Sequence, residues 1–220
     1  MINRTALMTV LAASGSFAAA DIVASFSFTD LNGSYSDDTG LFTAAAANDA
    51  DFASGGDVSL LTGSKGTAQY DTGFFGLGSS DVSLELDISN VTASSADGVG
   101  FITITDSDGD TLTASIAGSW DIINPFGFMF FSGTSSDFTF SDNGNADGEF
   151  NGVNGSFSIA SLTSQVFDGA VSLLLQNFGG FDAGSFDGVS TEADGLLIPT
   201  PGVLAIAGLG LAGMTTRRRK

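Results

Sequence analysis

The segment DVSLELDISN, residues 81–90, alternates apolar and polar side chains at successive positions. Its apolar positions are Val82, Leu84, Leu86 and Ile88, and its polar positions are Ser83, Glu85, Asp87 and Ser89. Successive side chains of a strand point to opposite faces, so a period of two predicts one buried face and one face in water. The segment therefore predicts a half-buried β-strand.

The same alternation recurs along the chain. The segment GFITITDSDGDTLTASIAG, residues 100–118, predicts strands at 101–105 and 111–116. The acidic turn between them contains Gly109, which can adopt the positive φ of a hairpin connection. Further strands are predicted in IVASFSFTD (22–30), DFTFSD (137–142), GSFSIASL (155–162) and AVSLLLQN (170–177). The best candidate for a helix is LFTAAAANDADFA, residues 41–53.

The length of 220 residues suits one domain with its own core. Many short strands, separated by turns in a chain with 30 glycines, predict an all-β fold. The expected architecture is a single antiparallel β-sandwich, jelly-roll-like, with a solenoid as the lesser alternative. We expect a signal peptide at 1–20, the acidic sandwich at 21–195 and a C-terminal signal at 196–220, with an apolar helix in each terminal segment.

The charge of the chain is unevenly distributed, and the formal net charge is -19. All 25 acidic residues lie between Asp21 and Asp194, where Lys65 is the only basic residue. A body this acidic repels nucleic-acid backbones and attracts cations, so no nucleic-acid partner is expected. The same charge also favours solubility, which is the simpler interpretation of it.

Two residue types are missing from the sequence: it contains 0 His and 0 Cys. Their absence excludes a disulfide framework, a zinc site of the usual kind, a cysteine nucleophile and a Ser-His-Asp triad. Paired carboxylates could still hydrolyse sugars, but the spacing of the acidic residues singles out no pair. We therefore predict a protein that is not an enzyme.

The N-terminus has the pattern of a secretory signal peptide. Arg4 supplies a positive start, residues 6–13 form a short, mostly apolar run, and small residues occupy positions 18–20. Signal peptidase is expected to cut between Ala20 and Asp21, where the acidic part of the chain begins. The mature protein should therefore begin at Asp21.

The C-terminus combines a proline-containing turn, an apolar run at 203–214 and a basic end. The turn consists of Pro199, Thr200, Pro201 and Gly202, and the basic end consists of Arg217, Arg218, Arg219 and Lys220. As a helix the apolar run would span about 18 Å, which is short of the roughly 30 Å hydrocarbon core of a membrane. The basic cluster should remain on the cytoplasmic side, so the tail is suited to a transient stage in the inner membrane.

This tail resembles the PEP-CTERM sorting signal, with Thr200 in the place of the usual glutamate. The resemblance implies recognition by an exosortase-like processing enzyme and removal of the tail near the prolines. It further implies a Gram-negative type of envelope, and delivery to the cell surface or to an extracellular polysaccharide matrix. The resemblance covers the tail and implies nothing about the task of the body.

Two loops have residues typical of calcium ligands, which are carboxylate, amide and carbonyl oxygens. The first carries Asp106, Asp108 and Asp110 at alternate positions, and the second carries Asn143, Asn145 and Asp147 before Gly148. The second loop resembles the start of an EF-hand loop with Asn at its first position. Calcium is the cofactor that these six residues would bind, and ordinary Asp/Asn/Gly turn chemistry is the alternative.

The segment NPFGFMFFSG, residues 124–133, is the densest run of aromatic residues in the chain. Phe126, Phe128 and Phe130 share one face of the expected strand, and Met129 and Phe131 share the other. We expect a strand buried on both faces, with an exposed patch that binds a partner as the alternative.

Together these features predict an exported, non-enzymatic protein of the cell surface or extracellular matrix. The first alternative is a calcium-dependent carbohydrate-binding module, and the second is a polysaccharide-active enzyme. Extracellular polysaccharide is the partner that either alternative would bind. Glycan binding with and without calcium distinguishes the main prediction from the first alternative.

Overall fold

The computed structural model describes residues 21–70, 81–123, 126–143 and 146–200. These residues form antiparallel strands and one short 3-10 helix, η1 (Phe181–Ala183). The strands are β1 (Ala24–Ser36), β2 (Leu41–Ala45), β3 (Gly55–Leu60), β4 (Gly66–Tyr70), β5 (Asp81–Ser89), β6 (Ser95–Thr105), β7 (Thr111–Ile123), β8 (Phe128–Ser141), β9 (Glu149–Asn151), β10 (Ser156–Ser158), β11 (Phe167–Gln176) and β12 (Phe186–Pro199). The predicted all-β antiparallel fold is confirmed.

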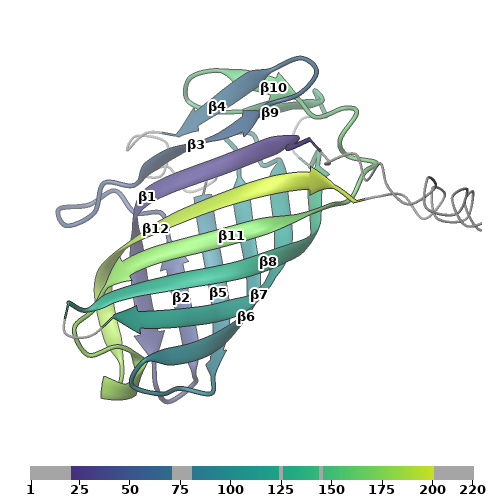
Figure 1. Ribbon diagram of the computed structural model, residues 1–220. Coiled ribbons are helices and arrows are strands. Elements are labelled where there is room, and N and C mark those ends of the chain that lie inside the picture. Colours follow the sequence, from purple (N-terminus) through teal and green to yellow (C-terminus); the bar gives the residue numbers. More distant parts are fainter. Residues whose placement is uncertain (1–20, 71–80, 124–125, 144–145, 201–220) are drawn as a thin grey trace, which may run out of the picture.

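The main sheet closes into an eight-stranded barrel (Figure 1). Its strands follow the order β12-β11-β8-β7-β6-β5-β2-β1, and β1 pairs again with β12. The predicted sandwich is therefore wrong, because the pairing of the first strand with the last joins the sheet to itself. Closure satisfies the backbone groups that the edges of an open sheet leave unpaired.

The first strand changes its partner halfway along. On one side β1 follows β12, and on the other its residues 24–29 pair with β3 and its residues 32–36 pair with β2. The change occurs at a bulge where Asp30 adopts a φ of 58°. The Asp30 carboxylate accepts hydrogen bonds from the Ala53 N–H (2.7 Å) and the Ser190 hydroxyl (2.8 Å). These bonds fix the point where β3 and β4 leave the barrel wall.

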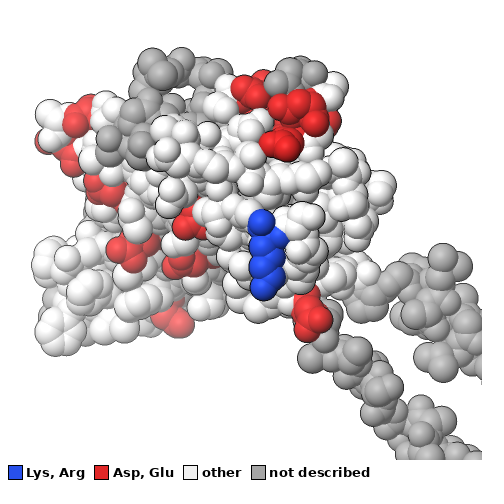
Figure 2. All heavy atoms as spheres, turned by 90° about the horizontal axis from the view of Figure 1, so that it is seen from above, with Lys and Arg blue, Asp and Glu red and all other residues white. Residues whose placement is uncertain are grey.

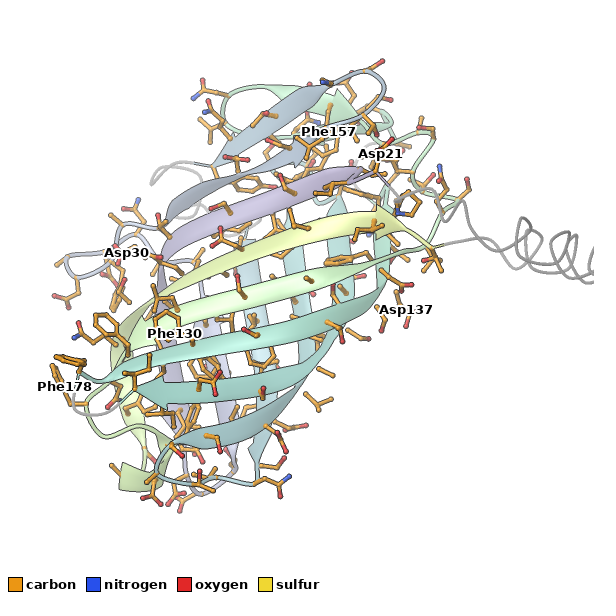
Figure 3. All side chains as sticks on the ribbon, in the orientation of Figure 1. Asp21, Asp30, Phe130, Asp137, Phe157 and Phe178 are labelled. Atoms are coloured by element: carbon orange, nitrogen blue, oxygen red, sulfur yellow. The ribbon has the colours of Figure 1, made fainter. Side chains whose placement is uncertain are left out.

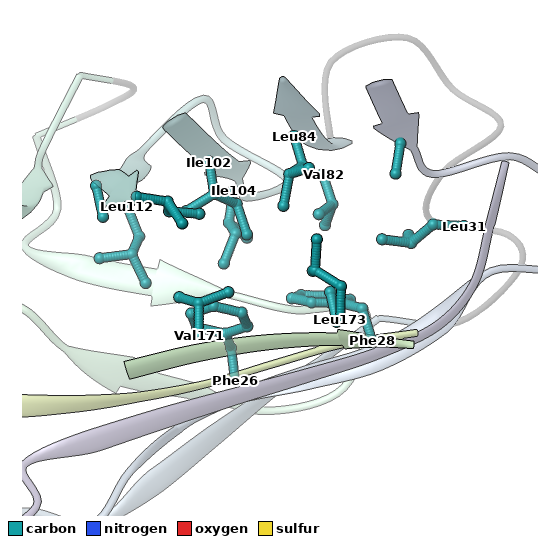
Figure 4. Packing of buried hydrophobic residues seen from close by; sticks show 14 of the residues in the cluster. Phe26, Phe28, Leu31, Val82, Leu84, Ile102, Ile104, Leu112, Val171 and Leu173 are labelled. Atoms are coloured by element: carbon teal, nitrogen blue, oxygen red, sulfur yellow. The ribbon is translucent and has the colours of Figure 1, made fainter. Parts of the chain in front are cut away.

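Inward-facing side chains fill the barrel. Figure 4 shows apolar side chains of β1, β5, β6, β7 and β11 meeting across the interior, and those labelled are buried: Phe26, Phe28, Leu31, Val82, Leu84, Ile102, Ile104, Leu112, Val171 and Leu173. Trp120 lies in the same core, with its ring centre 5.4 Å from that of Phe42 and 5.3 Å from that of Phe131. An alternation of period two is thus enough to build this core, because each strand turns one face inward.

A second, two-stranded sheet caps one end of the barrel. Its strands β9 and β10 carry Phe150 and Phe157, whose rings stack with their centres 5.6 Å apart. Both rings contact Phe140 of β8 edge-on, at 5.9 and 6.1 Å. This aromatic cluster attaches the hairpin, and the loop that leads into it, to the barrel.

Two local predictions are wrong. Residues 41–45 of the expected helix form β2, because Phe42 and Ala44 alternate inward as part of the barrel wall. The segment 124–133 is not buried on both faces: Met129 and Phe131 are buried, whereas Phe128 and Phe130 face outward and are 38% and 37% exposed. Among the described residues, no layer covers the outer face of β8 at these positions.

The last strand runs to Pro199, beyond the predicted end of the body at Gly195. Within it Leu197 is fully buried and pairs with Gly169 of β11. Residues 196–199 are therefore part of the barrel. The predicted signal peptide, the apolar tail with its helix, and the basic end lie outside the described residues. Within the described ranges, no helix is long and apolar enough to cross a membrane.

Candidate cation site

The first acidic loop connects β6 to β7 and is organised by Asp106. Its Oδ1 accepts hydrogen bonds from the backbone N–H groups of Asp108 (2.8 Å), Gly109 (2.9 Å) and Asp110 (2.9 Å). Gly109 has a φ of 97°, a conformation that favours glycine and lets the loop close in this way. Asp106 is therefore the residue that shapes the loop, and three N–H donors occupy one of its oxygens.

The second acidic loop follows β8 and leads into the capping hairpin. Asp142 Oδ2 accepts a hydrogen bond from the Gly148 N–H (3.1 Å), and Asp147 Oδ1 accepts one from the Glu149 N–H (2.8 Å). Ala146 and Gly148, which flank Asp147, have φ values of 59° and 75°, so the chain turns sharply around Asp147. The turn places both Asp142 and Asp147 on the side of the first loop.

Asn151 joins the two loops. Its N–H donates to Asp106 Oδ2 (2.7 Å), and its side-chain amide donates to Asp108 Oδ2 (3.1 Å) and to Asp147 Oδ2 (3.4 Å). The pairing of β7 with β8 brings the loops together, because Thr111 and Ser141 are register partners. Asp110 immediately precedes the first of these residues and Asp142 immediately follows the second.

Three carboxylates converge where the loops meet. Asp110, Asp142 and Asp147 each place one carboxylate oxygen so that all three oxygens lie within 4.8 Å of one another. Calcium binds oxygens at 2.3–2.6 Å, so two oxygens on opposite sides of the ion are about 5 Å apart. The spacing of the three oxygens therefore suits ligands of one calcium ion.

The environment of this cluster favours a cation. Asp110 is fully buried, and Asp142 Oδ1 is a buried acceptor that has no hydrogen-bond partner among the described residues. Burial of an acceptor without a partner costs about 1–3 kcal/mol, and more for a charged group. Figure 2 shows several groups of acidic side chains and a single basic one, since Lys65 is the only Lys or Arg in the described part of the chain. The described part of the protein thus offers little positive charge to compensate the cluster.

Two neighbouring groups have shifted pKa values. Burial raises the pKa of Asp106 above its ordinary value; the N–H groups that bind it oppose this shift, and the charge of Asp110 adds to it. Burial, and then the charge of Asp106, raise the pKa of the Tyr70 hydroxyl well above 10.0. Both shifts are those expected of groups held in a poorly solvated, negatively charged region.

The structure distributes the six predicted ligands over different roles. Asp110 and Asp147 lie in the converging cluster, whereas Asp106 shapes the first loop and Asp108 accepts the Asn151 amide. Asn143 donates to the Thr111 hydroxyl (3.0 Å). Asn145 lies outside the described residues.

Two residues of the site were not predicted. Asp142 directly precedes the EF-hand-like pattern, and it could have been found by aligning the ends of the two paired strands. Asn151 could not have been found by spacing alone, because its role depends on the path of the hairpin after Asp147. Comparisons with protein-family models, with curated proteins and with solved structures found no match for this chain.

Proposed function

We propose that this chain is an exported, non-enzymatic protein of the cell surface or extracellular matrix, whose barrel binds calcium between its two acidic loops. The observation that carries the calcium site is the buried Oδ1 of Asp142, which has no hydrogen-bond partner in the described part of the chain and lies beside the carboxylates of Asp110 and Asp147. A calcium ion would supply the missing partner and offset the repulsion among three carboxylates.

The proposed role of the ion is structural. The first loop leads into β7 and the second follows β8, and the second loop leads into the hairpin that caps the barrel. An ion bound to both loops would therefore stabilise the attachment of the cap. Extracellular calcium modules bind with dissociation constants of about 10⁻⁴–10⁻³ M, which suits a protein outside the cell.

Calcium is expected to raise the melting temperature of the protein. At a hundredfold excess over the dissociation constant, binding adds about 2.7 kcal/mol, which corresponds to roughly 5–10 °C for a domain of this size. The measurement is calorimetry in calcium at a hundredfold excess over this dissociation constant, about 10–100 mM, and in chelator at matched ionic strength. The ionic strength is matched because salt alone relieves repulsion in so acidic a body.

Asp142→Asn should reduce this calcium response, since it keeps the shape of the side chain and removes its charge. The matched control is Asp168→Asn, which makes the same change at an exposed position of β11 outside the loops. If calcium left the melting temperature of the wild-type protein unchanged, or raised that of Asp142→Asn equally, the site would not bind calcium as proposed.

The sorting proposal rests on the two terminal patterns and on the position of Pro199. Because β12 keeps its backbone pairing as far as Pro199, cleavage upstream of this residue would cut a strand of the barrel. We place the cut at or after Thr200, in the segment that follows the strand. Signal peptidase and an exosortase-like enzyme are the processing partners of this route.

Mature surface material is expected to begin at Asp21 and to lack residues 203–220. Replacing Arg217, Arg218, Arg219 and Lys220 by serine should let the chain cross the inner membrane uncut, because the charges that halt translocation are gone. Mass spectrometry of intact surface material measures both ends. Detection of Arg217 or Lys220 on mature protein would show that the tail is a lasting anchor.

A further inference from the structure

An exposed aromatic patch occupies the end of β7 and β8 that lies opposite the acidic loops. Phe128 and Phe130 project outward from β8 with ring centres 6.2 Å apart, and Ile123 is the cross-strand neighbour of Phe128. Phe126 and Phe178 in the adjoining loops are 62% and 71% exposed. Figure 3 shows Phe130 and Phe178 at the same end of the barrel. The four phenylalanines and Ile123 are together termed the aromatic patch.

The backbone holds this patch in place. The Asn177 N–H donates to the Gly127 carbonyl (2.7 Å), and the Gln176 side chain donates to the Phe126 carbonyl (3.1 Å). Gly127 has a φ of 71°, and a Cβ added there would lie 2.8 Å from the Phe178 Cα. The two loops that carry Phe126 and Phe178 are thus fixed to each other, so the aromatic patch is organised in advance of binding.

A shallow groove of about 520 Å³ begins next to the patch, and its lining combines apolar surface with a row of polar side chains. Ser132 is two residues beyond Phe130 on the same outward face of β8, and its register partner on β11 is Ser172. The row continues through Asp194 on β12 to Ser27 on β1. The groove therefore offers hydroxyl and carboxylate groups across four strands, a width of about 14 Å.

The charge of the surface selects among possible partners. Among the described residues, Asp194 is the only charged residue that lines the groove, and none of the groove's described lining residues is Lys or Arg. An anionic polymer would lack a counter-charge here, and a second copy of this chain would bring its own acidic surface against this one. A cationic polymer would be attracted to every acidic face and would not select this one. An uncharged chain molecule is the partner that remains.

We propose that the aromatic patch and the adjoining groove bind an uncharged polysaccharide. The C–H faces of its sugar rings pack on Phe128 and Phe130, and its hydroxyl groups bond to Ser132, Ser172 and Asp194. The inference rests on the proposed export, which brings the protein to such chains. It does not depend on the calcium site, which lies at the other end of β7 and β8.

The test is affinity electrophoresis of the purified full-length chain through gels containing hydroxyethyl cellulose, dextran, mannan or pullulan, with an alginate gel as the anionic comparison. We expect retardation by at least one uncharged polysaccharide and none by alginate, both with calcium and with chelator. The double variant Phe128→Ser/Phe130→Ser should weaken binding by about tenfold or more. The matched control is Phe101→Ser, at an outward phenylalanine of β6 that is 47% exposed and lies outside the patch.

A second variant, Ser172→Tyr, fills the groove from an exposed position and leaves the aromatic patch intact. It should lose binding while keeping the wild-type melting temperature, which separates lost contacts from lost folding. Absence of retardation by all four uncharged polysaccharides would overturn the proposal. Equal retardation of the wild type and both variants, or a dimer in solution that the double variant abolishes, would do so as well. A failed calcium response alone would leave this result unaffected.

Discussion

Asp106→Ala is expected to destabilise the barrel by about 3–5 kcal/mol, because the change removes a carboxylate that accepts four backbone N–H groups. Of these, the Gly109 N–H keeps a longer bond to the Asp106 carbonyl (3.4 Å). A buried donor without a partner costs about 1–3 kcal/mol, and water reaching the exposed side of the loop should recover part of the sum. For a domain of this size the loss corresponds to a fall in melting temperature of roughly 6–20 °C. Denaturant unfolding in chelator measures it without a contribution from calcium.

Asp106→Asn should destabilise the protein less than Asp106→Ala does. The amide oxygen can still accept the three N–H groups of the β6–β7 loop, whereas the amide nitrogen would face the Asn151 N–H as a second donor. A change that keeps the loop but breaks its link to the hairpin separates the two functions of this carboxylate. Equal stability of the alanine variant and the wild type would show that Asp106 does not organise the loops.

The same carboxylate should make stability depend on pH. Its pKa lies above the ordinary 3.8 in the folded state, so the native protein binds this proton more tightly than the unfolded chain does. The stabilisation is complete below the unfolded value of 3.8 and is lost as the pH rises through the raised pKa. The free energy of unfolding of wild type relative to Asp106→Asn should therefore decrease as the pH rises through this window. A difference that is constant from acid to neutral pH would contradict the assignment.

The strands could be predicted from the sequence because alternation depends only on neighbouring residues. Val82, Leu84, Leu86 and Ile88 are buried as their spacing predicts. Barrel closure could not be predicted in this way, because it depends on β1 pairing with β12, near the other end of the described chain. A sandwich and a barrel require the same alternation in each strand, so the pattern does not distinguish them.

Part of the candidate site could also be predicted from the sequence, because that part depends on a local pattern. Asp106, Asp108 and Asp110 stand out because acidic residues alternate in one turn, but which carboxylates meet depends on strand register. The pairing of Thr111 with Ser141 places Asp110 beside Asp142, a residue that no local pattern singled out. The sequence correctly predicted that Phe128 and Phe130 share one face of the strand. Their exposure was only the alternative to burial, because a shared face does not reveal whether another layer covers it.

Trp120→Ala is expected to lower the free energy of unfolding by about 3–5 kcal/mol. This destabilisation is comparable to the one expected for Asp106→Ala. The indole is fully buried inside the barrel and contacts Phe42, Phe131 and Phe181 at ring-centre distances of 5.2–5.4 Å. These rings come from β2, from β8 and from η1, so one side chain packs against separate parts of the barrel. Its removal leaves a cavity that the closed wall cannot easily collapse to fill.

Trp120→Phe separates the volume of this side chain from its polarity. The indole N–H is buried and has no hydrogen-bond partner in the described ranges of the chain. Gly98 provides the space beside it, since a Cβ added there would lie 3.2 Å from the nitrogen. Phenylalanine removes this unsatisfied donor and much less volume than alanine does, so the expected cost is about 1 kcal/mol or less. Denaturant unfolding of both variants in saturating calcium gives the two values. Similar large losses in both would mean that the indole nitrogen has a partner in the folded protein, and a small loss in Trp120→Ala would mean that the barrel interior is not packed around this residue.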